Sequence, residues 1–158
     1  MFKIGDKIVY PMHGAGIIDA IEVQEVLGEY RRYYVMQMPI GDMKVMIPMA
    51  NVESLGIREV ISAEEADDVF KVLQAECTEM PQNWNHRFRN NREKIRTGDI
   101  FEVAEVVRNL ACHERTKGLS TGERKMLENA RQILISELVL AKNCSEQDIE
   151  REIDRVLA

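Results

Sequence analysis

The chain has 158 residues, of which 45% are apolar and 30% charged, and its 27 acidic and 21 basic side chains give a net charge of −6. This composition is typical of a soluble globular protein with one ordinary domain or two small ones, and no apolar run approaches the ~20 residues that a membrane span needs. The three cysteines are widely spaced without a C-x-x-C pair, and the amino-terminal residues carry charges where a signal peptide would be apolar. We therefore expect free thiols, a reducing compartment and a cytoplasmic protein.

Residues 1 to about 61 have the pattern of a small β domain. Short apolar runs recur at even spacing and are separated by turns that contain glycine or proline. The predicted strands are Lys7–Tyr10, 17–26, 30–38, a strand through Met43, Val45 and Ile47, and a last one within 55–61, with a tight turn at Gly14-Ala15-Gly16. Strands at this spacing are typical of a strongly bent sheet or an open barrel.

After Ile61 the apolar period becomes helical. Helix starts are predicted at four capping patterns, Ser62-x-x-Glu65, Asp99-x-x-Glu102, Ser120-x-x-Glu123 and Ser145-x-x-Asp148, and a further helix follows Pro81. Gly98 and Gly118 stand where helices end. The sequence thus predicts an α+β protein, in which a β domain over residues 1–58 precedes a compact bundle of about five helices over residues 59–158.

The stretch PQNWNHRFRNNREKIRTG, residues 81–98, is a basic island on an acidic chain. It holds the only tryptophan, Trp84, and between 84 and 96 it has five basic side chains against one acidic. An aromatic residue near the start of a basic helix suits nucleic acid, and residues 108–131, with six basic against three acidic side chains, can extend the same positive surface. However, Trp84, Phe88 and Ile95 also form one helical stripe, and on spacing alone a packed Trp84 is favoured over an exposed one.

The sequence contains no catalytic motif. Gly14-Ala15-Gly16 has no third glycine and no helix after it, and no P-loop pattern occurs. The neighbours Cys112 and His113 point about 100° apart on a helix and have no third partner. We therefore expect no enzyme, no metal, no cofactor and no small-molecule substrate. Met46 shares a strand face with Asp42 and Lys44, so this methionine is expected to be exposed, as suits a protein partner.

Three motifs together resemble the CarD/CdnL transcription regulators of bacteria. They are F-K-I-G-D-K-I-V-Y-P-M-H-G-A-G at the start, P-x-N-W-x-x-R-F at 81–88 and G-L-S-T-G-E-R-K-M-L-x-x-A-R-Q-I-L at 118–134. The first is shared with the polymerase-binding module of transcription-repair coupling factors, whose motor motifs are absent here. The resemblance implies a Tudor-like (SH3-like) β domain that docks on the β subunit of RNA polymerase. It also implies a helical domain that contacts promoter DNA at the upstream edge of the transcription bubble.

The resemblance also assigns residues to these roles. Trp84 matches the family's wedge, which enters the minor groove where the duplex opens. The polymerase-contact positions of the family fall on Gln24, Glu25, Val26, Lys44 and Met46, and relatives carry arginine at the positions of Gln24 and Met46. The side chains expected to approach DNA phosphates are Arg87, Arg89, Arg124 and Lys125, with His86 as a lesser candidate.

We therefore predict a non-enzymatic regulator that docks on RNA polymerase and stabilises the open promoter complex, with DNA contacts largely independent of sequence. No membrane is expected among its partners. The alternative is a protein–protein adaptor without DNA contact, in which Trp84 is a core residue or an interface anchor.

Overall fold

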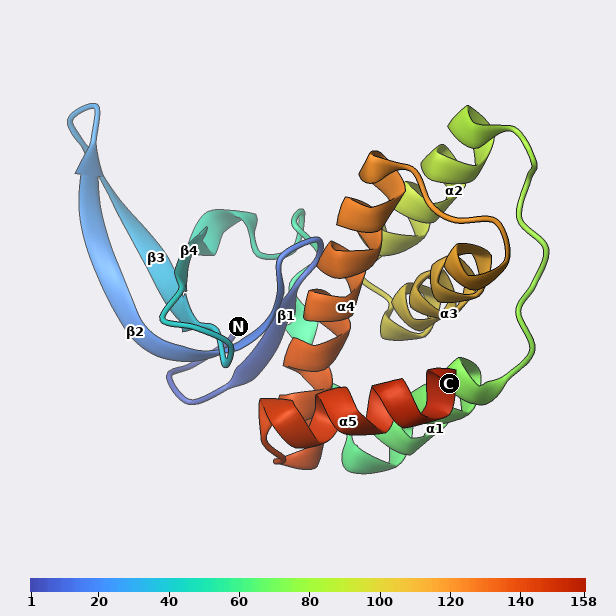
Figure 1. The fold of residues 1–158 in the computed structure, drawn as a ribbon. Coiled ribbons are helices and arrows are strands. Elements are labelled where there is room, and N and C mark those ends of the chain that lie inside the picture. Colours follow the sequence, from blue (N-terminus) through green and yellow to red (C-terminus); the bar gives the residue numbers. More distant parts are fainter.

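The computed structural model describes residues 1–158. It consists of a five-stranded antiparallel sheet followed by five α-helices (Figure 1). The strands are β1 (Lys7–Tyr10), β2 (Gly14–Val26), β3 (Glu29–Gln37), β4 (Lys44–Pro48) and β5 (Arg58–Glu59), in the spatial order β4-β3-β2-β1-β5. The predicted α+β class is confirmed, because the chain completes its sheet before its first α-helix begins.

The predicted turn at Gly14-Ala15-Gly16 is wrong, because these residues already belong to β2. Gly14 pairs with Tyr10, and the chain reverses just before it, at Met12, whose φ is 75°. Gly16 is required for close approach rather than for a turn, since a Cβ there would lie 2.5 Å from Cγ of Met36 on β3. The last predicted strand is also shorter than expected and is limited to β5.

The core of the sheet half lies at the base of the long β2–β3 hairpin. Ile18, Tyr34, Met36 and Ile47 are fully buried there. The register between β2 and β3 shifts between Ile18 and Ala20, as at a β-bulge, and beyond this point most of the side chains are exposed. The outer end of the hairpin therefore projects away from the rest of the molecule (Figure 1).

The helices are α1 (Ala63–Gln74), α2 (Trp84–Arg96), α3 (Ile100–Thr116), α4 (Thr121–Lys142) and α5 (Glu146–Leu157). Each has a side-chain cap at its start, and Ser62 and Ser120 form the complete capping boxes expected from the sequence. One apolar cluster of 20 buried residues joins the helices. None of the five is both long enough and apolar enough to cross a membrane.

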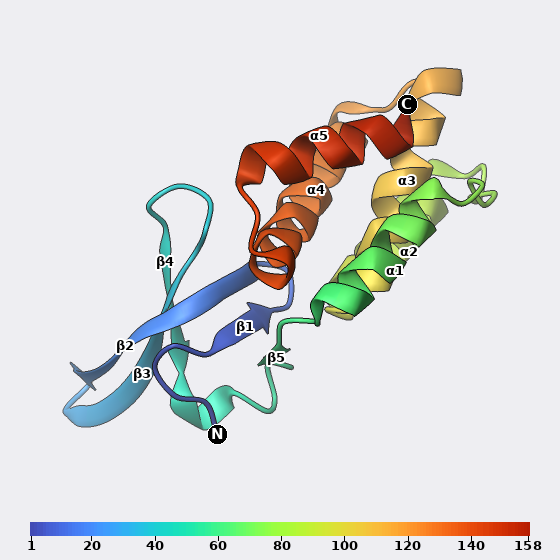
Figure 2. The ribbon, with the colours of Figure 1, turned by 90° about the horizontal axis from the view of Figure 1, so that it is seen from below.

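The two halves meet through α4, which stands between the sheet and the other helices (Figure 1). Figure 2 shows β1 and β5 on the side of the sheet nearest the helices. Arg58 of β5 binds the buried carboxylate of Glu137 through two hydrogen bonds of 2.7 Å. It also donates to the carbonyl of Gly98, at 2.8 and 3.0 Å, and to that of Glu59, at 2.9 Å. The backbone N–H of Ala15 donates to Ser136 Oγ at 2.9 Å. The junction is partly buried and leaves no buried side-chain polar atom without a partner, so the two halves form one packed body.

Candidate nucleic-acid interface and docking strands

Trp84 is the first residue of α2, and its side chain is partly exposed but held by contacts with neighbouring side chains. Asn83 caps the helix by accepting from the backbone N–H of His86 at 3.1 Å. The indole stacks on Phe88, with ring centroids 4.9 Å apart and planes 15° from parallel, and its Nε1–H donates to Ser120 Oγ at 2.9 Å. Trp84 nevertheless remains 40% exposed, whereas Ile95, at the other end of the same stripe, is 3% exposed. The stripe therefore changes from exterior to core along the helix.

Ser120 links the tryptophan to the start of α4. Its hydroxyl accepts from the backbone N–H of Glu123 and from the Trp84 indole, and it donates to Glu123 Oε1 at 3.2 Å. A serine hydroxyl has one donor and two acceptor sites, so all three are in use. The cap of α4 consequently fixes the orientation of the indole ring.

Arg87 lies in surroundings that differ from those expected of a phosphate contact. It is only 8% exposed, and its guanidinium binds Glu123 with Nε–Oε2 at 2.7 Å and Nη2–Oε1 at 3.1 Å. Its Nη1 donates to the carbonyls of Pro81 and Gln82. The hydrogen bond from Arg87 is the main cause that lowers the pKa of Glu123, and the same bond raises the pKa of Arg87. Arg87 thus fastens the segment that leads to Trp84, and its charge is already neutralised.

The other side chains predicted near DNA, His86, Arg89, Arg124 and Lys125, are exposed. Arg124 faces Glu114 at 3.7 Å, whereas Arg89 and Lys125 have no carboxylate partner. Arg92 is also exposed and without such a partner, although it was not among the expected contacts. The two helix N-termini that meet at Trp84 add partial positive charge.

The positive surface is smaller than the sequence predicted, because several cations of α2, α3 and α4 are engaged elsewhere. Lys94 pairs with Glu105 at 3.1 Å and Arg131 with Asp154 at 2.7 Å. Arg108 is 5% exposed and donates to the carbonyl of Val72 at 2.9 Å. Of the cations on α2 and α4, Arg89, Arg92 and Lys125 remain exposed without a carboxylate partner.

The docking positions expected on the sheet lie on β2 and β4. The pairing registers place Gln24, Lys44 and Met46 on one face of the sheet, and Gln24 Nε2 lies 3.6 Å from Met46 Sδ. Lys44 pairs with Asp19 at 3.3 Å, and Met46 is 37% exposed. β4 is an edge strand of the sheet.

The remaining two positions expected to dock on polymerase lie at the outer end of the β2–β3 hairpin. Glu25 is opposite Tyr30 and therefore on the other face of the sheet, while Val26 is opposite Glu29 beside the turn. Gln24 pairs with Arg31, which places an arginine beside this position. The five positions are thus spread along the β2–β3 hairpin and the edge strand β4, and they do not form one flat patch.

Comparisons with known proteins cover both halves of the chain. The family model described as "CarD-like/TRCF RID domain" matches residues 2–61, and "CarD, C-terminal domain" matches residues 68–154. The chain is 45% identical over 150 residues to "Putative transcription factor YdeB" of Bacillus subtilis (strain 168), which covers 95% of this chain and 98% of that protein. The solution NMR structure of the 72-residue N-terminal domain of Myxococcus xanthus CarD is 32% identical, covers 37% of this chain and 79% of that one, and has a TM-score of 0.33. The chain therefore belongs to the CarD/CdnL family of transcription factors.

Proposed function

We propose that this protein docks on the β subunit of RNA polymerase through its sheet and stabilises the open promoter complex by inserting Trp84 into the minor groove at the upstream edge of the bubble. It acts by binding, without catalysis or cofactor. Membership of a transcription-factor family and the match of residues 2–61 to the CarD-like/TRCF RID domain support the polymerase contact.

The observation that carries the DNA contact is the supported but open position of Trp84. Its ring is held by the Phe88 stack and the Ser120 hydrogen bond and is still 40% exposed. A flat aromatic ring held in this way loses little conformational freedom when it stacks on an unpaired base, and such stacking contributes about 1–3 kcal/mol per base. Arg89, Lys125 and the two helix N-termini supply the nearby positive charge for phosphates.

The charge of the whole molecule favours recruitment over independent DNA binding. A protein of net charge −6 with few free cations is expected to bind DNA alone with a dissociation constant of about 10⁻⁴ M or weaker. Attachment to polymerase beside the bubble supplies an effective concentration of about 1 mM. That concentration is sufficient to occupy such a weak site for most of the time, so each half depends on the other.

The decisive experiment replaces Trp84 by alanine and by phenylalanine, and measures open-complex lifetime, polymerase binding and thermal stability on the same samples. Losing about 1–3 kcal/mol of stacking shortens the stabilised part of the lifetime by about 5- to 150-fold in Trp84→Ala. Trp84→Phe keeps a flat ring and gives an intermediate lifetime. Polymerase binding is unchanged, and Tm falls by only a few degrees because the ring is half exposed.

The outcome also separates this function from the alternative adaptor. If the open-complex lifetime is unchanged while polymerase binding is intact, Trp84 does not act as a wedge in DNA, and the protein–protein adaptor is favoured. Loss of folding in Trp84→Ala would make the tryptophan a structural residue, since removing a core tryptophan costs about 3–5 kcal/mol.

A further inference from the structure

Two cysteines that are far apart in the sequence meet in the structure. Cys77 lies in the segment between α1 and α2, and Cys112 lies on α3. Cys77 Sγ is 3.9 Å from the carbonyl oxygen of Arg108. This carbonyl is one helical turn before Cys112, so it lies beside that residue's own side chain. Both cysteines line one cavity of about 500 Å³.

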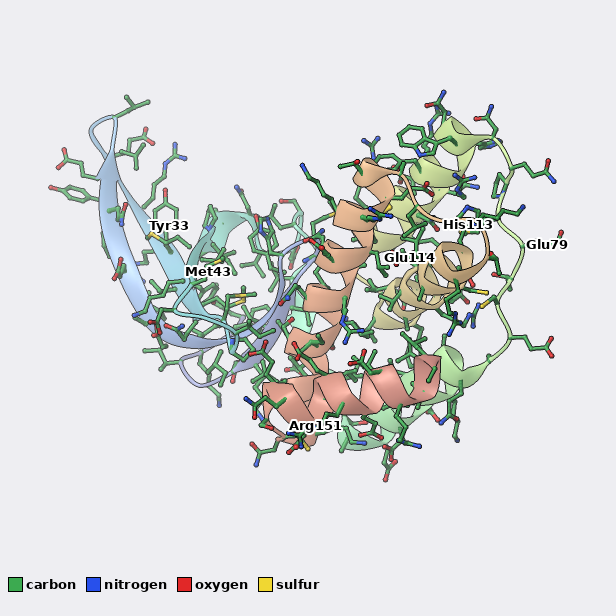
Figure 3. The ribbon with its side chains drawn as sticks, in the orientation of Figure 1. Tyr33, Met43, Glu79, His113, Glu114 and Arg151 are labelled. Carbon is green, nitrogen blue, oxygen red and sulfur yellow. The ribbon has the colours of Figure 1, made fainter.

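The backbone around Cys77 is held in place independently of the thiols. The N–H of Thr78 donates to Asn109 Oδ1 at 3.1 Å, and Asn109 Nδ2 donates back to Thr78 Oγ1 at 2.8 Å. Asn109 is 2% exposed and lies one turn before Cys112 on the same face of α3. Figure 3 labels Glu79 on this segment and His113 on the facing helix. A disulfide requires two cysteines whose backbones hold their side chains close together, and these hydrogen bonds fix the backbone beside Cys77 against α3.

We propose that Cys77 and Cys112 form a dithiol site that a small organic disulfide oxidises to an intramolecular disulfide, cross-linking the segment before Trp84 to α3. The exposed Cys77 thiolate attacks one sulfur of the reagent, forms a mixed disulfide and releases the first reagent thiolate. The Cys112 thiolate then attacks the Cys77 sulfur and releases the second. Two protein thiols are oxidised, one reagent disulfide is reduced, and the two protons leave with the two small thiols.

The surroundings of Cys77 make this exchange slow at neutral pH. Burial and the hydrogen bond with Cys112 raise the pKa of Cys77, while the positive charges of Arg108 and Arg115 oppose that rise. The other charged or titratable groups at the cavity are Glu79 of the same segment, Arg87 of α2, and His113 and Lys117 at the end of α3. Because the thiolate is the attacking species, oxidation quickens as pH rises. Brief exposure to oxidant at neutral pH therefore leaves the pair reduced.

The third cysteine supplies a matched control, because Cys144 is also free but lies after α4, where its thiol donates to the carbonyl of Lys142. The protein is incubated with glutathione disulfide at mildly alkaline pH and digested without reduction for mass spectrometry. We expect one peptide pair joining Cys77 to Cys112 in the unaltered chain and in Cys144→Ser. A stable glutathione adduct on Cys77, a link to Cys144, or three unmodified thiols would overturn the proposal.

A second measurement tests the cross-link without depending on the proposed DNA contact. A disulfide between these positions closes a loop of about 35 residues, so oxidation should raise Tm by about 5–10 °C in the unaltered chain and in Cys144→Ser. The same treatment should leave the Tm of Cys77→Ser and Cys112→Ser unchanged. An oxidised protein with an equal or lower Tm would show that the bond strains the fold and would refute the cross-link as drawn.

Discussion

The guanidinium of Arg87 and the carboxylate of Glu123 form a buried pair, with N···O distances of 2.7 and 3.1 Å, that joins the start of α2 to the start of α4. Glu123 is 1% exposed, and its oxygens also accept from Ser120, whose hydroxyl holds the Trp84 indole. One pair of charges thus supports both helix starts on either side of the tryptophan.

Removing one member of this pair should destabilise the fold strongly. Glu123→Gln keeps the side-chain volume but leaves Arg87 as a buried cation without a counter-charge, which costs about 3–5 kcal/mol of unfolding free energy in urea titrations. The matched control is Glu93→Gln, because Glu93 and Arg96 form an exposed pair at 3.2 Å, whose loss costs under about 1 kcal/mol. An equal loss of unfolding free energy in the two variants would contradict this, because it would show that the Arg87 guanidinium becomes hydrated when Glu123 is replaced.

The same pair predicts how stability depends on pH. The hydrogen bond from Arg87 lowers the pKa of Glu123 below its ordinary value of 4.5, so the folded state holds this proton less tightly than the unfolded state. The contribution is complete above pH 4.5 and is lost as pH falls through the lower folded pKa. The pKa of Arg87 is raised, so its contribution is present at every pH below the ordinary, strongly basic pKa of an arginine and does not change the acid side of the curve. We expect Glu123→Gln to show a shallower fall of unfolding free energy below about pH 4.5 than the unaltered chain; parallel curves would contradict this.

Ser120 should control how firmly the indole is held. Ser120→Ala removes the helix cap and the acceptor for Trp84 Nε1, and it should cost about 1–2 kcal/mol of stability and make the tryptophan fluorescence more accessible to acrylamide. Ser120→Thr retains the hydroxyl and serves as the control. If the alanine and threonine variants are quenched equally, the hydrogen bond does not orient the ring.

The free cations should act on DNA without regard to base sequence. Arg89→Ala and Lys125→Ala should each weaken polymerase-bound promoter contact on all promoters alike and reduce the slope of log K against log salt by about one unit. Arg151, on α5 and labelled in Figure 3, is a control cation with a 79% exposed side chain outside the proposed surface. A loss confined to one promoter sequence would indicate base reading instead.

The docking face should respond to charge changes at β4. Met46→Asp and Lys44→Glu should weaken binding to RNA polymerase in a pull-down or titration. Stability should change by no more than about 1 kcal/mol, because both side chains are exposed and the Lys44–Asp19 pair lies at the surface. Ile4→Asp alters an exposed apolar residue away from these strands and should leave the affinity intact. Unchanged affinity in both β4 variants would exclude this face from the interface.

The sequence predicted the helices well because each one carries its own local start signal. Ser62, Ser120 and Ser145 cap the helices expected of them. The turn before β2 was misplaced because glycine occurs both in turns and where two strands pack closely. The sequence does not distinguish these roles, and only the position of Met36 shows that Gly16 permits close packing.

The site was less predictable because its contacts join distant parts of the chain. The spacing of Trp84 and Phe88 indicated a shared stripe, but the partial exposure of the indole depends on Ser120, which is 36 residues away. Arg87 looked like one of several surface cations, and its burial follows from Glu123, read in the sequence only as a capping residue. The meeting of Cys77 with Cys112 likewise depends on the hydrogen bonds between Thr78 and Asn109, and no local pattern signals it.

The junction around Arg58 and Glu137 holds the sheet and the helices of the molecule at a fixed distance from each other. A flexible tether would let the helical half search along DNA, whereas this joint sets a constant separation between the β2–β3 hairpin and the start of α2 (Figure 1). On the proposed function, the protein therefore holds the DNA-contacting helix starts at a fixed distance from its site on polymerase. On this proposal, the position of the polymerase on the promoter, rather than any base sequence, decides which base step the indole contacts.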